Sequence, residues 1–177
     1  MGTATLVVPS FPMATLEITD QSPFSAIGAA VAKAVEAAVP NLRALSESRA
    51  EQPRAPGKWS PKQVIGHLID SAANNHQRFI RAQEGASYTG PGYTQDHWVA
   101  VQGYQDASWD DLIALWSAYN RHLARVIERI PDGKRGTTCT IGADAPVTLG
   151  FLAADYVRHL RHHLAQADAL PESSPTK

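Results

Sequence analysis

The chain has 177 residues, of which 44% are hydrophobic and 19% are charged, a composition typical of one ordinary globular domain. The formal net charge is −1 and no basic block occurs, so nonspecific binding to nucleic acid has no electrostatic support. The single cysteine, Cys139, excludes a disulfide within the chain and a cysteine-rich metal site.

Targeting signals are weak or missing in this sequence. Residues 1–12 lack both the positive start and the long apolar run of a secretory signal peptide. No stretch approaches the roughly 18–20 apolar residues that span a bilayer. A single thiol fits a reducing compartment. We therefore expect a cytoplasmic protein with no membrane partner and no nucleic-acid partner.

The two ends of the chain differ from its middle. Residues 1–20 contain Pro9 and Pro12 and no clear period, which predicts an extended N-terminal arm. Residues 171–177 are polar and proline-bearing, which predicts a frayed tail. Residues 21–170 are then expected to form a single domain.

The first helical pattern covers residues 23–51. Its apolar side chains recur at helical spacing, and Pro40 is expected to kink the helix or split it in two. The second pattern starts at Ser60, where a serine N-cap, Pro61 and Gln63 make a strong start signal, and it ends near Gly85.

The third pattern begins at the N-cap Ser108 and stops at Pro131, with a bundle-type stripe that steps alternately by four and three residues. The fourth runs from about Thr148 to about Leu170. Residues 134–147 include a possible short extended piece around residues 137–141. Four amphipathic helices without strand alternation predict an all-α fold, a four-helix bundle.

The link between the second and third patterns, residues 86–107, is 22 residues long. Links of this length are uncommon within a compact domain and are usually functional. Four aromatic residues of the link can either wall a substrate pocket or pack against helix ends: Tyr88, Tyr93, Trp98 and Tyr104.

Three histidines suggest a chemistry. His159 and His163 are four residues apart, so on a helix they lie one turn apart on one face. His67 lies beside the apolar face of the second helix. Three buried imidazoles are costly without a partner, and one divalent cation satisfies all three, with an open position for water as in catalytic zinc sites. The alternative is that each is a hydrogen-bonded core histidine, because the sequence does not show that the two helices meet.

The remaining polar candidates have weaker support. His162 is expected near the pair or at the surface, and His76 and His122 at helix surfaces. Asp70 and Asp155 are candidates to accept the free ring N–H of a ligand histidine, with exposed helix carboxylates as the alternative. No strong general base emerges, and the best catalytic candidates are Asp96 and His97 in the long link. Cys139 is expected to be structural rather than nucleophilic.

The combination resembles the DinB-like (DinB/YfiT-like) superfamily of proposed metal-dependent enzymes, over roughly residues 23–168. Similar to family segments are Lys58-Trp59-Ser60 followed by Val64 and Gly66-His67-Leu68, then His159-x-x-x-His163 with the doubled His162-His163, and more loosely Tyr93-x-Gln95-Asp96-x-Trp98. The arm before residue 20 departs from the family pattern.

This resemblance implies an up-down-down-up four-helix bundle, and a divalent metal, usually zinc or nickel, held by His67, His159 and His163. It also implies a homodimer, and activities such as transfer of a low-molecular-weight thiol to an electrophile. The expected function is therefore a metal-dependent enzyme acting on a small molecule, a thiol transferase or a hydrolase. The alternative is a noncatalytic metal-binding or stress-response bundle that acts as a dimeric interaction module.

Overall fold

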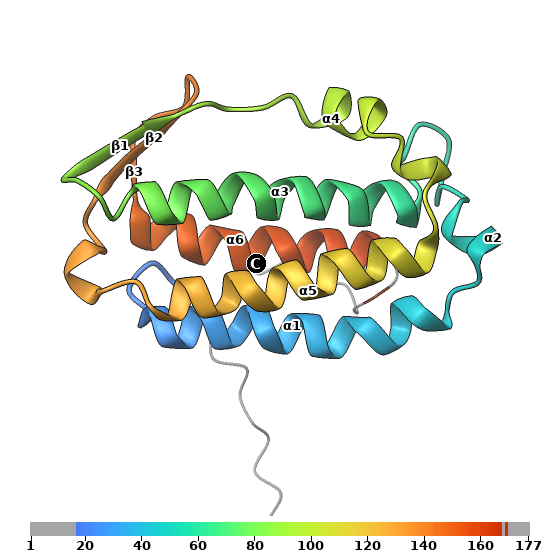
Figure 1. Cartoon of the computed structure of the whole chain (residues 1–177), viewed down its shortest axis with the longest axis horizontal. Helices are drawn as coiled ribbons and strands as arrows, with labels where there is room; N and C mark the ends of the chain where they lie inside the picture. The colour runs from blue at the N-terminus through green and yellow to red at the C-terminus, as the bar shows by residue number, and fades with distance from the viewer. Residues whose placement is uncertain (1–16, 168, 170–177) are drawn as a thin grey trace, which may run out of the picture.

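The computed structural model describes residues 17–167 and residue 169. Four long helices form the body of the molecule: α1 (Phe24–Ala44), α3 (Pro61–Arg81), α5 (Trp109–Glu128) and α6 (Leu149–Gln166). Both α1 and α3 pack against α5 and against α6. Helices α1 and α6 run in one direction, and α3 and α5 in the other (Figure 1). The predicted all-α four-helix bundle with an up-down-down-up connection is therefore confirmed.

Helix α1 differs from the prediction at its C-terminal end. Pro40 lies inside it without interrupting it, and the chain leaves the helix at Leu45 before the short α2 (Glu47–Ala50), which Ser46 caps. The predicted split at Pro40 is wrong. Proline deprives the carbonyl of Glu36 of its helical partner, but Glu36 and Pro40 are both exposed, so water can hydrate that carbonyl.

Helix α3 starts as predicted. The Ser60 hydroxyl accepts a hydrogen bond from the Gln63 backbone N–H at 3.3 Å, and the Gln63 side-chain carbonyl accepts one from the Ser60 N–H at 3.0 Å. Pro61 occupies the first turn. These reciprocal bonds satisfy two backbone donors that the helix itself leaves free, and they fix the residue at which the helix begins.

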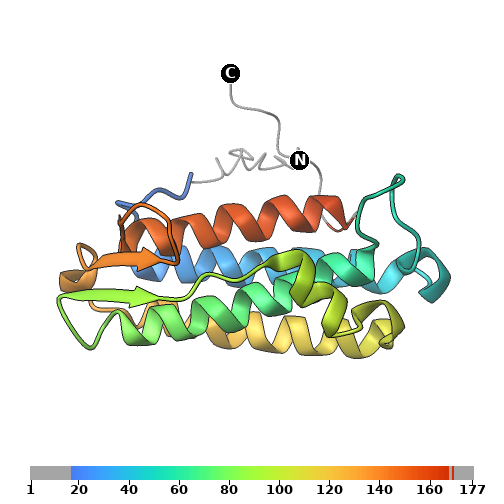
Figure 2. The ribbon, with the colours of Figure 1, turned by 90° about the horizontal axis from the view of Figure 1, so that it is seen from above.

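The long link crosses the whole bundle. It contains β1 (Ser87–Gly90), α4 (Gln95–Val101) and a 3-10 turn, η1 (Tyr104–Asp106), and it runs along α3 back to the end at which α3 began (Figures 1 and 2). Its length follows from the topology: α5 is parallel to α3, so the chain must return the length of α3 before α5 begins.

A small sheet closes the other end of the bundle. After the turn η2 (Asp132–Lys134), strands β2 (Thr138–Ile141) and β3 (Val147–Thr148) follow, and the order is β1-β2-β3 with β1 parallel and β3 antiparallel to β2. The extended piece predicted at residues 137–141 is confirmed as β2. Its pairing with β1 was not predicted, because β1 is four residues long and offers little pattern.

Outside the described part of the chain lie residues 1–16 of the predicted arm and the whole predicted tail, residues 171–177. The described end of the arm is packed: Ile18 is buried in the core and the Asp20 backbone carbonyl accepts a hydrogen bond from Arg135 at 2.8 Å. Among the described helices, none combines the length and the apolar character needed to cross a membrane.

Candidate metal centre

Three imidazoles meet between α3 and α6. His67 extends from α3, and His159 and His163 extend from α6. The Nε2 atoms of His67 and His159 are 3.1 Å apart, and one ring nitrogen from each of the three residues lies within 4.8 Å of the others. The structure therefore brings together the three histidines that the sequence singled out.

The position of the pair on α6 explains why the cluster is accessible. The most deeply buried face of α6 is formed by Leu149, Ala153, Val157, Leu160 and Leu164. His159 and His163 lie on the half-buried flank of that face, next to its most buried residues rather than among them. His67 is only 1% exposed. The cluster thus has a buried base and two half-buried members that face cavities.

Gly66 allows the link to pack next to His67. The ring of Tyr104, in η1, lies so close to Gly66 that an added Cβ would meet ring atoms at 2.1–2.2 Å. The Tyr104 hydroxyl donates to the Asp70 carboxylate at 2.6 Å, one turn further along α3. Gly66 therefore allows the link to pack closely against α3, directly beside His67, a candidate metal ligand.

Trp59 covers one side of the cluster. Its ring centre lies 5.0 Å from that of His67 and 6.4 Å from that of His163. Trp59 directly precedes the N-cap Ser60, so the same start signal that fixes α3 also places an indole over the imidazoles. This placement gives a structural reason for the adjacent tryptophan and serine in the sequence motif.

The outer ring nitrogens of His159 and His163 have side-chain partners. His163 Nδ1 is 2.8 Å from Gln166 Oε1, and His159 Nδ1 is 3.4 Å from Ser71 Oγ. Gln166 Nε2 in turn lies 2.9 Å from Nε2 of the exposed His162. An Nδ1–H that donates to Gln166 leaves Nε2 of His163 as a lone pair, which is the state that a metal ligand requires. Neither Gln166 nor Ser71 was predicted, because their roles appear only once the rings are placed.

The two carboxylates predicted as histidine partners have other partners. Asp70 Oδ1 accepts from Tyr104 and, at 2.5 Å, from Gln102, so Asp70 holds the link against α3. Asp155 forms an ion pair with Arg158 at 2.8 Å. Asp155 still acts on the cluster through space, because its negative charge opposes the lowering of the His159 pKa.

Burial and mutual repulsion keep the imidazoles neutral. Desolvation, followed by the charges of His163 and His159, lowers the pKa of His67 from 6.5 to about 3. Desolvation and the nearby His163 lower the pKa of His159 to about 4, and burial also lowers the pKa of His163. At neutral pH all three rings are therefore uncharged, as metal binding demands.

The donor set fits one divalent cation. Two nitrogens that share a tetrahedral cation, each bonded at 2.0–2.1 Å, lie roughly 3.4 Å apart, close to the 3.1 Å between His67 and His159. His67 Nδ1 is buried without a partner among the described residues, so Nε2 is the ring nitrogen through which His67 contacts the cluster. Three neutral imidazoles are the ligand set of open zinc sites.

Cavities reach the cluster from two sides. One, of about 500 Å³, is lined by His163, Gln166, Trp59, Lys58 and Asp96, among others. The second, of about 270 Å³, is lined by His159, Ser71, Tyr93, Arg78 and Asp155, among others. The two cavities thus reach different histidines of the cluster and have different linings.

The remaining candidates are distributed unevenly. Asp96 lines the cavity at His163, whereas His97 is exposed and lines none of the described cavities. Of the four aromatic residues of the link, Tyr93 lines the cavity at His159, Trp98 packs against Tyr93 with ring centres 5.1 Å apart, and Tyr104 is buried. Tyr88 lines a third cavity, away from the histidines.

Three further predicted side chains lie away from the cluster. His76 is half-buried rather than at the surface, 3.2 Å from the Tyr119 hydroxyl and next to the exposed His122. Cys139 is buried in the sheet, and burial raises the pKa of its thiol, which agrees with a structural role.

Comparison with known proteins relates the chain to one superfamily. The sequence model of the DinB superfamily matches residues 31–167. A protein of Oceanobacillus iheyensis named "Putative metal-dependent hydrolase" is 22% identical over 124 residues, 70% of this chain and 71% of that protein. A Geobacillus kaustophilus protein of the same name is 25% identical over 130 residues, 71% of each chain.

A solved structure has the same architecture. YfiT from Bacillus subtilis, described as "a probable metal-dependent hydrolase with an unusual four-helix bundle topology", superposes with a TM-score of 0.63 at 20% identity. The match covers 92% of this chain and 90% of YfiT. At this identity the likeness concerns the fold.

Proposed function

The chain belongs to the DinB superfamily, and from this membership and its three-histidine cluster we propose that it is a divalent-metal-dependent hydrolase of a small molecule. The observation that carries the proposal is the convergence of His67, His159 and His163 from two helices, with nitrogens within 4.8 Å of one another. The names of the relatives support the reaction class.

The residues of the site would have different roles. His67, His159 and His163 would hold the cation, and Gln166 and Ser71 would fix the ring orientations through the outer nitrogens. When bound, a cation with an open position supplies Lewis acidity, which polarises a carbonyl and makes water a stronger acid. Asp96 is the link carboxylate that lines the larger cavity, where it would accept a proton.

A second candidate is transfer of a low-molecular-weight thiol. The specific observation in its favour is that cavities reach the cluster from both the His163 side and the His159 side, which gives room for two reactants. The single cysteine of the chain is buried, so the thiol would come from the substrate. Zinc or nickel is the proposed metal, and the homodimer implied by the resemblance stays a prediction.

Metal analysis tests the proposal directly. The protein, purified without a histidine tag, is expected to bind about one zinc or nickel ion per chain by mass spectrometry. The double variant His159→Ala, His163→Ala is expected to lose it while keeping its helical circular dichroism spectrum. The matched control is His122→Ala, which removes an exposed histidine of α5 and should keep the metal.

Measurements of turnover then distinguish the hydrolase, the thiol transferase and the noncatalytic bundle. Hydrolysis of activated esters by the metal-loaded protein, and its loss in the double variant, would support the hydrolase, and transfer of a thiol to an electrophile would support the second candidate. A metal held without either activity would favour the noncatalytic bundle. If neither zinc nor nickel binds when offered, the proposal is wrong.

A further inference from the structure

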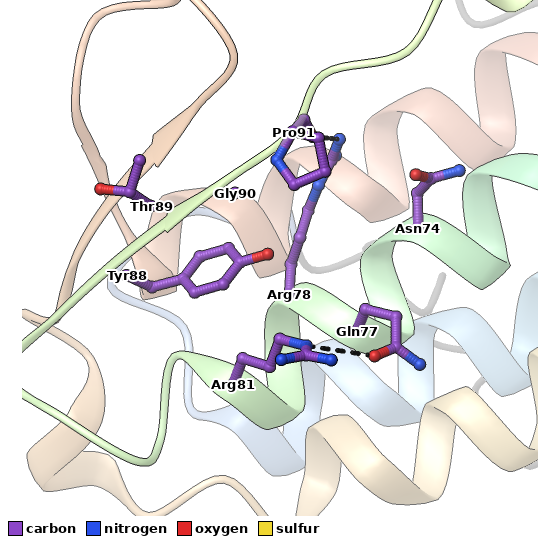
Figure 3. A pocket seen from close by; sticks show the side chains of 8 residues that line it. All are labelled: Asn74, Gln77, Arg78, Arg81, Tyr88, Thr89, Gly90 and Pro91. Carbon is purple, nitrogen blue, oxygen red and sulfur yellow. Dashed lines mark hydrogen bonds between the residues drawn. The ribbon is translucent and has the colours of Figure 1, made fainter.

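A third cavity lies beside the C-terminal half of α3, under β1. It has a volume of about 290 Å³ and is lined by Asn74, Gln77, Arg78, Arg81, Tyr88, Thr89, Gly90 and Pro91 (Figure 3). Two of these residues carry a positive charge, and none of the eight is a carboxylate. The ring of Tyr88 reaches across the cavity with its hydroxyl toward Arg78 (Figure 3). The cavity therefore combines positive charge with polar donors.

The two arginines have unused hydrogen-bonding capacity. Arg78 donates to the Asn75 side chain and to the Pro91 carbonyl, both at 3.4 Å, and Arg81 donates to the Gln77 side chain at 3.2 Å. Neither arginine forms an ion pair with a described acidic residue. A guanidinium has five N–H donors arranged to bind a carboxylate or a phosphate through two parallel bonds.

Arg78 connects this cavity to the histidine cluster. It also lines the cavity of about 270 Å³ that reaches His159, together with Ser71 and Asn75, which lie on the same side of α3. His67 and Arg78 are eleven residues apart on α3, which corresponds to about 16 Å along the helix axis. A substrate that reached both ends would be extended rather than compact.

Acidic groups near Arg78 compensate its charge only in part. Asp144 and Asp155 both line the cavity at His159. Asp155 is paired with Arg158, and the exposed Asp144 acts on Arg78 electrostatically without a direct ion pair. Half-buried positive charge of this kind favours an anionic ligand.

We propose that Arg78 and Arg81 bind an anionic group, a carboxylate or a phosphate, at the far end of a substrate whose reacting end lies at the histidine cluster. The part of this inference that concerns the reacting end rests on the proposed function. The anion-binding part does not, because it requires no metal.

The first test uses metal-free protein. Inorganic phosphate and succinate are titrated separately, at constant ionic strength set with sodium chloride, while the side-chain Nε–H resonances of the arginines are followed by NMR. Saturable shifts at Arg78 and Arg81 with a common millimolar Kd are expected, and the tighter of the two anions identifies the group. Shifts absent at both arginines, or shared by all surface arginines, would overturn the proposal.

Three variants make the result specific. Arg78→Gln and Arg81→Gln are each expected to weaken binding of the anion at least tenfold. Arg121→Gln, on the exposed side of α5, should leave the affinity unchanged. Arg81 is exposed, so its variant remains informative even if Arg78→Gln loosens β1. Equal affinity in Arg81→Gln and the control would count against the site.

The second test links the cavity to catalysis. With metal-loaded protein, Arg78→Gln is expected to raise KM for 4-nitrophenyl hydrogen sebacate, an extended monoester with a free terminal carboxylate, at least tenfold more than KM for the neutral methyl 4-nitrophenyl sebacate of the same chain length. An equal effect on both esters would contradict substrate recognition by Arg78. If no ester is hydrolysed although the anions bind, the proposed function fails while the anion site stands.

Discussion

The outer nitrogen, Nδ1, has different surroundings in each of the three histidines of the cluster. Nδ1 of His163 has a short contact to Gln166, Nδ1 of His159 has a longer one to Ser71, and Nδ1 of His67 is buried without a partner in the described structure. Such contacts fix the tautomer and the ring angle of a metal ligand. The three ligands are therefore expected to depend unequally on their surroundings.

Substitution of the outer partners should reveal this order. Gln166→Ala removes the 2.8 Å contact to His163 and is expected to weaken zinc binding about 10- to 100-fold. Ser71→Ala removes a contact of 3.4 Å and should weaken zinc binding less. Competition with a chelator at neutral pH measures both affinities. Wild-type affinity in Gln166→Ala would refute the orienting role of this side chain.

At the scale of elements, the N-terminus of α3 organises the site. The Ser60 hydroxyl caps the helix and also donates to the Gln105 side chain in the long link at 2.6 Å. Two residues later, buried Lys62 joins α2 to α3 through ion pairs with Glu47 and Glu51. These contacts hold α2, α3 and η1 around the segment that carries Trp59 and His67.

Removal of the Ser60 cap should lower the free energy of unfolding more than removal of a helix cap that makes no further contact. Ser60→Ala loses the cap and removes the hydroxyl that donates to Gln105 Oε1, so we expect a loss of about 1.5–3 kcal/mol in the free energy of unfolding. Ser108→Ala is the matched control, because Ser108 is exposed and its side chain makes, among the described residues, only the capping bond that it accepts from the Asp111 N–H. A loss of about 0.5–1.5 kcal/mol is expected there. Urea unfolding measures both values, and equal losses would refute the added role of Ser60.

At the scale of the whole molecule, the buried imidazoles link stability to pH. In the unfolded chain a histidine has a pKa near 6.5, whereas the folded state holds His67 at about 3 and His159 at about 4. Between these values the unfolded state binds more protons, so stability is full above about pH 6.5 and falls as the pH decreases toward 4. The charges of His162, His163 and Asp155 also act on this group of rings.

Metal-free protein should therefore lose stability on mild acidification. From pH 6.5 to pH 5, the shifted pKa of His67 is expected to remove on the order of 1.5 kcal/mol. His67→Gln should flatten this slope, since it removes the titrating group and keeps a polar side chain of similar length. Urea unfolding at pH 7, 6 and 5 in the presence of a chelator provides the measurement. Identical slopes in the two proteins would contradict the buried, neutral state of His67.

Local sequence rules determined a large part of this protein. The caps at Ser60 and Ser108, the apolar periods of the four long helices and the placement of His159 and His163 on one face all depend on residues within one or two turns of each other. The resemblance to the DinB-like superfamily supplied the topology and the grouping of His67 with the other two. These features are encoded locally or in short motifs, which is why they could be predicted.

Only the tertiary structure decided how distant segments meet. The pairing of β1 with β2, the engagement of Asp70 by Tyr104 and Gln102, the contact of Gln166 with His163, and the positions of the cavities all join groups whose distance is set by helix packing. The effect of Pro40 also depended on packing, because the exposure of Glu36 and Pro40 on the folded bundle allowed α1 to continue. A side chain chooses its partner among the neighbours that packing provides, and those neighbours lie far away in the sequence.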